Sequence, residues 1–316
     1  MTAIDEPADT PPDADVAATE VGQEETSAVE PTGSGDATRK QVRREQFRVL
    51  IKSPAFVTGV LIVGFWVLAA IVPQLFTSLD PKAFSEAGSQ TKPGGDAWFG
   101  TDQVGRDVFA RVIHGARPIL IVAPLATVMA IIGGTFLGLI MGYYRGWVDE
   151  VLSRVVEAVL SIPVILMAIL IIFTFGGSRL VVIFTIAVLF VPAITRTIRS
   201  ASIAESDLDY VTSAKMRGES GFFIVTREIL PNVTSLVVVE FTVRLGYAVF
   251  TYATLAFLGQ INTDITIPDW GIDVSGNYEQ IIRDVWWPSI FPALAIATLV
   301  IGVNLITDTI DKAFKS

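Results

Sequence analysis

Residues 209–232 read DYVTSAKMRGESGFFIVTREILPN, a polar segment that lies between two long apolar runs. Small residues at Ser213 and Ala214, followed by Gly218 and Gly221, predict a short helix that stops, turns and re-enters a second helix. Its charged side chains are expected to keep the segment at the aqueous interface rather than in lipid. Because the small faces allow close approach of a partner's backbone, the segment is interpreted as a docking element rather than a merely solvated loop.

The composition around this segment is that of an integral membrane protein. Apolar residues make up 51% of the 316 positions, charged residues only 17%, and the mean hydropathy is +0.56. The absence of cysteine removes disulfides and thiolate metal sites from consideration, without deciding the redox compartment. The net charge of −9 comes from residues 1–38, which contain ten acidic and no basic residues. The remainder is close to neutral, and no nucleic-acid partner is expected.

The N-terminal region divides into two parts by charge. Residues 1–38 are predicted to form a disordered acidic cytoplasmic tail, because they have almost no large apolar side chain to bury. A passive solvated tail is favoured over a regulatory one, and the region lacks the pattern of a cleaved signal peptide. Residues 39–55 form a basic juxtamembrane segment, which the positive-inside rule places in the cytoplasm. Orientation alone explains this cluster, with binding of anionic lipid as the alternative.

Six apolar runs in residues 56–316 predict an all-α polytopic membrane protein with six transmembrane helices, since each run is near the roughly 20 residues that a span needs. The even number of spans returns the C-terminus to the cytoplasm. The external loop, 77–118, carries five basic residues against the positive-inside rule, but the stronger N-terminal charges set the orientation. A cytoplasmic loop, which contains the docking element and is called the coupling loop after the resemblance given below, covers residues 199–232. The runs are 56–76, 119–143, 151–175, 180–198, 233–257 and 290–310.

Small residues recur at every fourth position along the second run, at Ala126, Ala130, Gly134, Gly138 and Gly142. This stripe predicts close helix packing or, with equal weight, a surface on which a neighbouring helix slides. Prolines inside the third, fourth and sixth runs predict kinks or local loosening.

Three ionisable residues fall at or near membrane depth, where such groups normally face a cavity or a partner. Glu240 and Arg244 are four residues apart on one helical face, so a local ion pair is favoured. A pore-lining Arg244 is the alternative, because a guanidinium can recognise the carboxylates and carbonyls of a ligand. Glu157, in the third run, is a further pathway candidate.

The external loop ends in residues 98–117, WFGTDQVGRDVFARVIHGAR, which predict an amphipathic helix at the outer membrane interface. Asp102, Arg106 and Asp107 are close enough in sequence to form a charge-assisted network that fixes the loop over the pore. This structural role is favoured over a contact with a binding protein. His114, the single histidine, has no neighbouring ligands in sequence, so no metal site is expected.

The opening segment resembles the cytoplasmic EAA loop of ABC-importer permeases, which couples the membrane domain to an ATPase. Thr212, Ser213 and Ala214 stand where the family has Glu-Ala-Ala, so Thr212 replaces the glutamate. The family's glycine follows at Gly218, and residues 230–232, Leu-Pro-Asn, close the motif. The ATPase-coupling residues that the resemblance implies are Asp209, Tyr210, Thr212, Ser213, Ala214, Met216, Arg217, Gly218, Ser220 and Gly221.

Four further strings resemble the C-type permease subunit of dipeptide, oligopeptide and nickel importers. Residues 99–107, FGTDQVGRD, are similar to its LGTDxLGRDV signature. Residues 144–150, YRGWVDE, are similar to GYYGGWVDE and are expected beside the ATPase or the coupling loop. Residues 255–259, LAFLG, and 267–271, IPDWG, are similar to LSFLGLG and the P.P.WG string that follows it. The resemblance covers the chain in register from Trp98 to the C-terminus.

This resemblance implies the ABC importer type I permease fold in a bacterial inner membrane, with both termini cytoplasmic. The chain would supply half of the pathway for di- or oligopeptides, with nickel chelate or haem as alternative cargo. Implied partners are a homologous B-type permease, two cytoplasmic ATP-binding subunits, an extracytoplasmic binding protein and membrane lipid.

The chain itself is not expected to be an enzyme. The sequence contains neither GxxxxGKS nor GxxxxGKT, so ATP and Mg would bind to the partner ATPases and no cofactor to this chain. A channel or scaffold outside the ABC class is the remoter alternative. A channel is disfavoured because no filter-like ring of residues is visible in the sequence.

Overall fold

The computed structural model describes residues 52–261, 264 and 266–315, apart from the side chains of the last two. The predicted acidic tail, 1–38, and most of the predicted basic segment, 39–55, lie outside the described residues. Within the described part, the regular structure is helical, and extended backbone pairs only in two isolated bridges of the loop before residue 108. The predicted all-α class is confirmed.

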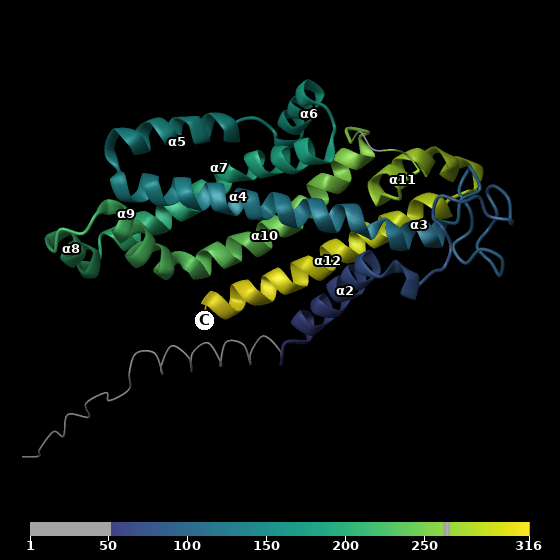
Figure 1. Ribbon diagram of the computed structural model, residues 1–316, viewed down its shortest axis with the longest axis horizontal. Coiled ribbons are helices and arrows are strands. Elements are labelled where there is room, and N and C mark those ends of the chain that lie inside the picture. The colour runs from purple at the N-terminus through teal and green to yellow at the C-terminus, as the bar shows by residue number, and fades with distance from the viewer. Residues whose placement is uncertain (1–51, 262–263, 265, 316) are drawn as a thin grey trace, which may run out of the picture. The chain divides into compact units, whose positions relative to one another are not determined.

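Five helices of the described part are long and apolar enough to cross a membrane. They are α2 (Pro54–Ile71), α4 (Ala116–Tyr144, continuing α3, Val108–His114), α7 (Arg179–Ser206), α10 (Leu230–Phe257) and α12 (Trp287–Lys315). In Figure 1, α4, α10 and α12 run side by side, with α8 (Asp209–Met216) at one end and α11 (Trp270–Asn277) at the other. These ends are called the α8 end and the α11 end below.

The third predicted span, 151–175, needs a correction, because it is not one straight helix. α5 (Gly146–Leu160) ends and α6 (Val164–Phe175) leaves it at 91°. Pro163 explains the break, because proline lacks an N–H and disfavours helical backbone at the residue before it. The prolines of the fourth and sixth spans lie inside continuous helices instead. Counted as one broken crossing, α5 and α6 complete the six predicted spans.

The helix that contains the fifth predicted span begins before the predicted apolar run. α9 (Gly221–Phe223) and η2 (Ile224–Ile229), a stretch of π-helix, lead into α10 without interruption. One helix therefore runs from Gly221 to Phe257. The π-helical stretch widens this helix just before Pro231, which cannot donate to the hydrogen-bond ladder.

The α11 end is held by two buried tryptophans. η1 (Pro73–Leu75) leads into a long loop, and η3 (Tyr278–Arg283) follows α11. The indole N–H of Trp270 donates to the carbonyl of Val112 at 2.7 Å, and that of Trp287 donates to the carbonyl of Thr101 at 2.9 Å. Both bonds join segments more than 150 residues apart, so they fix the loop and α3 onto α11 and α12.

The small-residue stripe of α4 packs against α7 along most of its length. An added Cβ would lie 2.6 Å from the Ile194 Cβ at Gly134 and 2.8 Å from the Ile198 Cβ at Gly138. At Gly142 it would lie 2.5 Å from the Ser202 Cβ. Such distances leave no room for a side chain, so the two backbones approach closely, as small-residue stripes allow in membranes. The structure thus shows the packing role that was one of the two interpretations of this stripe.

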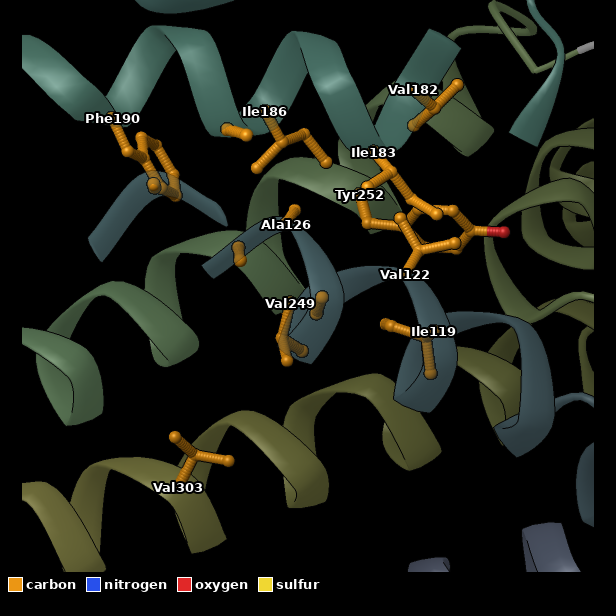
Figure 2. Close-up of a cluster of buried hydrophobic side chains, with 14 of the residues drawn as sticks. Ile119, Val122, Ala126, Val182, Ile183, Ile186, Phe190, Val249, Tyr252 and Val303 are labelled. Carbon is orange, nitrogen blue, oxygen red and sulfur yellow. The ribbon is translucent and has the colours of Figure 1, made fainter. Parts of the chain in front are cut away.

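A hydrophobic core lies where α4 passes between α7 and α10. Figure 2 shows Val122 and Ala126 of α4 near Ile183 and Ile186 of α7, with Tyr252 of α10 beside them. These side chains are buried. The core fixes α4, α7 and α10 relative to one another, and the opposite ends of all three helices border the candidate site at the α8 end.

Candidate functional site at the α8 end

α8 ends in a Schellman motif built on Gly218. The N–H of Gly218 donates to the carbonyl of Lys215 at 3.0 Å, and that of Glu219 donates to the carbonyl of Ala214 at 3.2 Å. Gly218 has a φ of +80°, a left-handed conformation that glycine adopts without strain. The sequence therefore stops α8 at the predicted position and turns the chain toward α9.

The next helix starts at a serine cap. The Ser220 hydroxyl accepts a hydrogen bond from the N–H of Phe223 at 3.3 Å. A Cβ added to Gly221 would lie 2.8 Å from the Tyr144 hydroxyl, so Gly221 lets the new helix pass close to the last turn of α4. The two predicted helices and their glycine turn are thus present, with Gly221 used for packing within the chain.

The two faces of α8 differ sharply in exposure. Val211 and Ala214 are fully buried against this chain's own core. Thr212 is exposed, and Met216 is 78% exposed. This corrects the expectation that Ala214 offers a small face to a partner, because the same small side chain is required for packing inside the chain. The outward face is instead formed by the exposed residues Leu208, Asp209, Thr212, Met216, Arg217, Gly218, Ser220 and Phe222, with Ser213 half-buried.

The Tyr210 hydroxyl joins α8 to the spans on both sides of it. It donates to the Glu205 carboxylate at the end of α7, at 2.7 Å, and accepts from the side-chain amide of Asn232 in α10, at 3.1 Å. Burial and the neighbouring Glu205 carboxylate raise the pKa of Tyr210 to about 12, so the hydroxyl keeps its proton at neutral pH. The Tyr210 hydroxyl therefore attaches α8 to the ends of two spans.

Two ion pairs connect α5 to the same region. The Arg145 guanidinium lies 2.7 Å from the Asp207 carboxylate and donates to the carbonyl of Ile203 at 3.0 Å. The Arg199 guanidinium donates to the Asp149 carboxylate at 2.6 Å between Nη2 and Oδ2. Residues 144–150 were expected beside the coupling loop, and the structure places them there. The pairs themselves were missed, since their partners lie 50 or more residues apart in sequence.

Charges on the exposed side of the loop are weakly held. Arg217 lies 3.9 Å from Glu219 and 3.8 Å from Glu228, and its side chain is more than half exposed. The Lys215 ammonium lies 5.2 Å from the centroid of the Tyr143 ring. Exposed pairs of this kind contribute little to stability. These charges therefore remain available to another protein surface.

At the α11 end, the predicted network forms only in part. The Asp102 carboxylate lies 2.7 Å from the Arg106 guanidinium and accepts hydrogen bonds from the N–H groups of Val104 and Arg106. Asp107 stands apart from this pair and caps α3, accepting from the N–H of Ala110 at 2.7 Å. Burial raises the pKa of Asp107. The expectation of one three-residue network is corrected, because the N-terminus of α3 requires its own acceptor.

A second buried cluster at the α11 end was not predicted. Arg111 of α3 donates through Nε to the Asp273 carboxylate of α11 at 3.0 Å. Tyr252 of α10 donates to Asp269 at 2.5 Å. Burial raises the pKa of Asp273 to about 6. Because Val108 and Arg111 are buried, α3 is part of the protein core rather than the amphipathic interfacial helix expected from its pattern.

The intramembrane charges separate into a pair and a single residue. Arg244 Nε lies 3.0 Å from a Glu240 carboxylate oxygen, with both side chains less than one-fifth exposed. The guanidinium also lies 5.8 Å from the centroid of the Tyr247 ring. Glu157 is exposed on α5 and forms no ion pair with the described residues. In the part of the chain that the structure describes, no three acidic, histidine or cysteine side chains gather closely enough to hold a metal.

Comparison with known proteins gives one family for this architecture. Residues 134–316 match the family described as "Binding-protein-dependent transport system inner membrane component". The chain is 35% identical to the dipeptide transport system permease protein DppC of Alkalihalophilus pseudofirmus, over 86% of this chain and 90% of that protein. It is 33% identical to a putative peptide transport system permease of Brucella suis, over 85% and 87%. It is 30% identical to the glutathione transport system permease GsiD of Pectobacterium atrosepticum, over 85% and 88%.

Proposed function

Because the chain belongs to the family of binding-protein-dependent transport system inner membrane components, we propose that it is a permease subunit of an ATP-driven ABC importer for peptides. As a family member it is a multi-pass inner membrane protein and a transport subunit rather than an enzyme. The arrangement of α8 is the main support for a role in coupling the ATPases to the membrane spans. Its outer face is exposed, while Tyr210 ties its inner side to α7 and α10.

The absence of a phosphate-binding loop from the sequence and the exposed face of α8 both suggest the partners of this chain. The sequence has no phosphate-binding loop, so ATP and Mg would be held, and ATP hydrolysed, by two cytoplasmic subunits seated on α8. A homologous B-type permease would supply the other half of the pathway. An extracytoplasmic binding protein would deliver the peptide at the α11 end. Under this assignment the α8 end and both termini would lie in the cytoplasm, as the basic residues of 39–55 and of the coupling loop favour. The five basic residues of the loop 77–118 would then lie outside.

The connections around α8 suggest how movement of the ATPases would reach the membrane. A shift of α8 would pass to α7 and α10 through the Tyr210 hydroxyl, and to α5 through the Arg145–Asp207 pair. Because α4 and α7 interlock through the glycine stripe, they would move together. Rigid spans moved in this way convert closure of the ATPases into alternating access.

Peptides are the cargo that the relatives favour. The three relatives named above are described as permeases for dipeptides, peptides or glutathione, whereas their descriptions mention neither nickel nor haem. In this chain, Glu240 and Arg244 satisfy each other as an ion pair, so they are assigned to holding α10 together within the membrane rather than to binding a substrate carboxylate.

Co-purification and uptake test this function. The complex should bring down its ATPase subunits in mild detergent and take up labelled dipeptide in ATP-loaded proteoliposomes when binding protein is present. Gly218→Asp adds a side chain and a left-handed strain to the exposed turn, so it should reduce ATPase binding and uptake at least tenfold. Glu219→Asp, at the next position, is the matched control and should change neither. A chain that purifies only as a homo-oligomer would favour a channel or scaffold.

A further inference from the structure

A groove of about 490 Å³ lies among four of the membrane-spanning helices. Its walls come from α2, α4, α10 and α12, and they are almost entirely aliphatic. The residues that shape it are Val67, Ala70, Leu120, Pro124, Val249 and Val303. These helices are long and apolar enough to cross a membrane, so the groove lies at the depth of the bilayer.

Arg117 is the only charged residue among the described residues that line this groove. It lies in the first turn of α4, at the α11 end, two residues before the predicted apolar run begins at residue 119. Its side chain is exposed, and no carboxylate of the described residues lies within 4.0 Å of its guanidinium. An arginine at this position places its charge at the level of the lipid headgroups, while its stem follows the apolar wall.

We propose that this groove binds one anionic phospholipid, with an acyl chain between α2 and α4 and the phosphate on Arg117. The guanidinium matches phosphate in charge and geometry, since it offers parallel N–H donors. Basic positions between transmembrane helices bind lipid headgroups by this chemistry. The site depends on the membrane location of the chain and not on the identity of the transported substrate.

The other occupants fit less well. A peptide would bring backbone amides into walls that offer no hydrogen-bonding side chain besides Arg117, at an uncompensated cost. A flexible hydrocarbon chain can follow a narrow cleft between four helices.

The test measures retention of phosphatidylglycerol by the purified transporter complex. Native mass spectrometry in mild detergent would count bound phosphatidylglycerol and phosphatidylcholine after equal exposure to both. The Arg117→Gln variant removes the charge, and Arg117→Lys keeps it. Ala70→Phe and Val67→Phe fill the groove from α2. Arg283→Gln is the matched control, because Arg283 is an exposed arginine at the same end that does not line the groove.

We expect the wild type and Arg283→Gln to retain phosphatidylglycerol in preference to phosphatidylcholine, with about tenfold less retention in Arg117→Gln and partial recovery in Arg117→Lys. At least one groove-filling variant should also release the lipid. A phosphatidylglycerol analogue with a photoreactive acyl chain should crosslink to α2 or α4. Equal retention by Arg117→Gln and wild type would overturn the proposal. So would undiminished retention by both filled variants, or crosslinks confined to a partner subunit.

Discussion

Replacing Tyr210 with phenylalanine removes one oxygen atom from the junction of α7, α8 and α10. The ring remains, so its contacts with the core are preserved. Two hydrogen bonds disappear, one to the Glu205 carboxylate at 2.7 Å and one from the Asn232 amide at 3.1 Å. α8 then keeps its own turn at Gly218 but loses its polar attachment to both neighbouring spans.

The size of this effect follows from the two partners. A hydrogen bond to a charged group contributes about 1.5–3 kcal/mol and a neutral one about 0.5–1.5 kcal/mol. Both values are discounted here, because Tyr210 is half-buried and the Asn232 amide still donates to the Glu228 carbonyl at 2.8 Å. A loss of about 1–2 kcal/mol in the attachment of α8 corresponds to a factor of roughly 5 to 30.

The assay is the number of peptides transported per ATP hydrolysed by the reconstituted complex. Tyr210→Phe should lower this ratio roughly 5- to 30-fold while ATP hydrolysis continues, because the ATPases would move α8 without moving the spans. Tyr278→Phe is the control, since it removes a tyrosine hydroxyl bonded to Glu279 at the opposite end of the molecule. A ratio within twofold of wild type for Tyr210→Phe would refute the assignment of this hydroxyl to coupling.

Three further changes test the structure by thermal unfolding of the purified protein. Glu240→Gln or Arg244→Gln should each lower the unfolding temperature, and the double variant should recover part of the loss, whereas additive effects would contradict the pair. Gly138→Ala should lower the free energy of unfolding by about 1–3 kcal/mol, because its Cβ would collide with α7. Gly64→Ala in α2 is the control and should leave it unchanged, because the space around Gly64 is open. Asp273, whose pKa is raised to about 6, favours folding most while protonated. The unfolding temperature of the wild type should therefore fall, relative to that of Asp273→Asn, as the pH rises from about 4 to about 6.

Much of the fold could be predicted because a bilayer imposes a simple rule on sequence. Apolar runs near 20 residues located the five helices that are long enough to cross a membrane and the bent α5–α6 pair, and the glycine at 218 located the end of α8. The right angle between α5 and α6 could not be predicted. Pro163 indicates a break, but the direction of the second helix depends on what it packs against.

The site was harder to predict because its contacts join distant segments. The bond between Arg111 and Asp273 spans 162 positions, and the sequence around Arg111 fits an amphipathic helix equally well. Ala214 shows a second reason why the site was hard to predict from the sequence. A small side chain is required both for a partner's approach and for internal packing, so the residue type alone could not assign it to one role.

The break at Pro163 also has a consequence for solvation. At the end of α5, the carbonyls of Glu157 and Ala158 accept hydrogen bonds from the N–H and the hydroxyl of Ser161, and Ser161 and Pro163 are exposed there. The carbonyl of Val159 accepts from the N–H of Ile162. Hydrocarbon cannot hydrogen-bond to a backbone carbonyl, and each carbonyl without a donor would cost several kcal/mol. The N–H and the hydroxyl of Ser161 therefore take the place of water at this corner, so the chain turns through 91° with these carbonyls bonded inside the molecule.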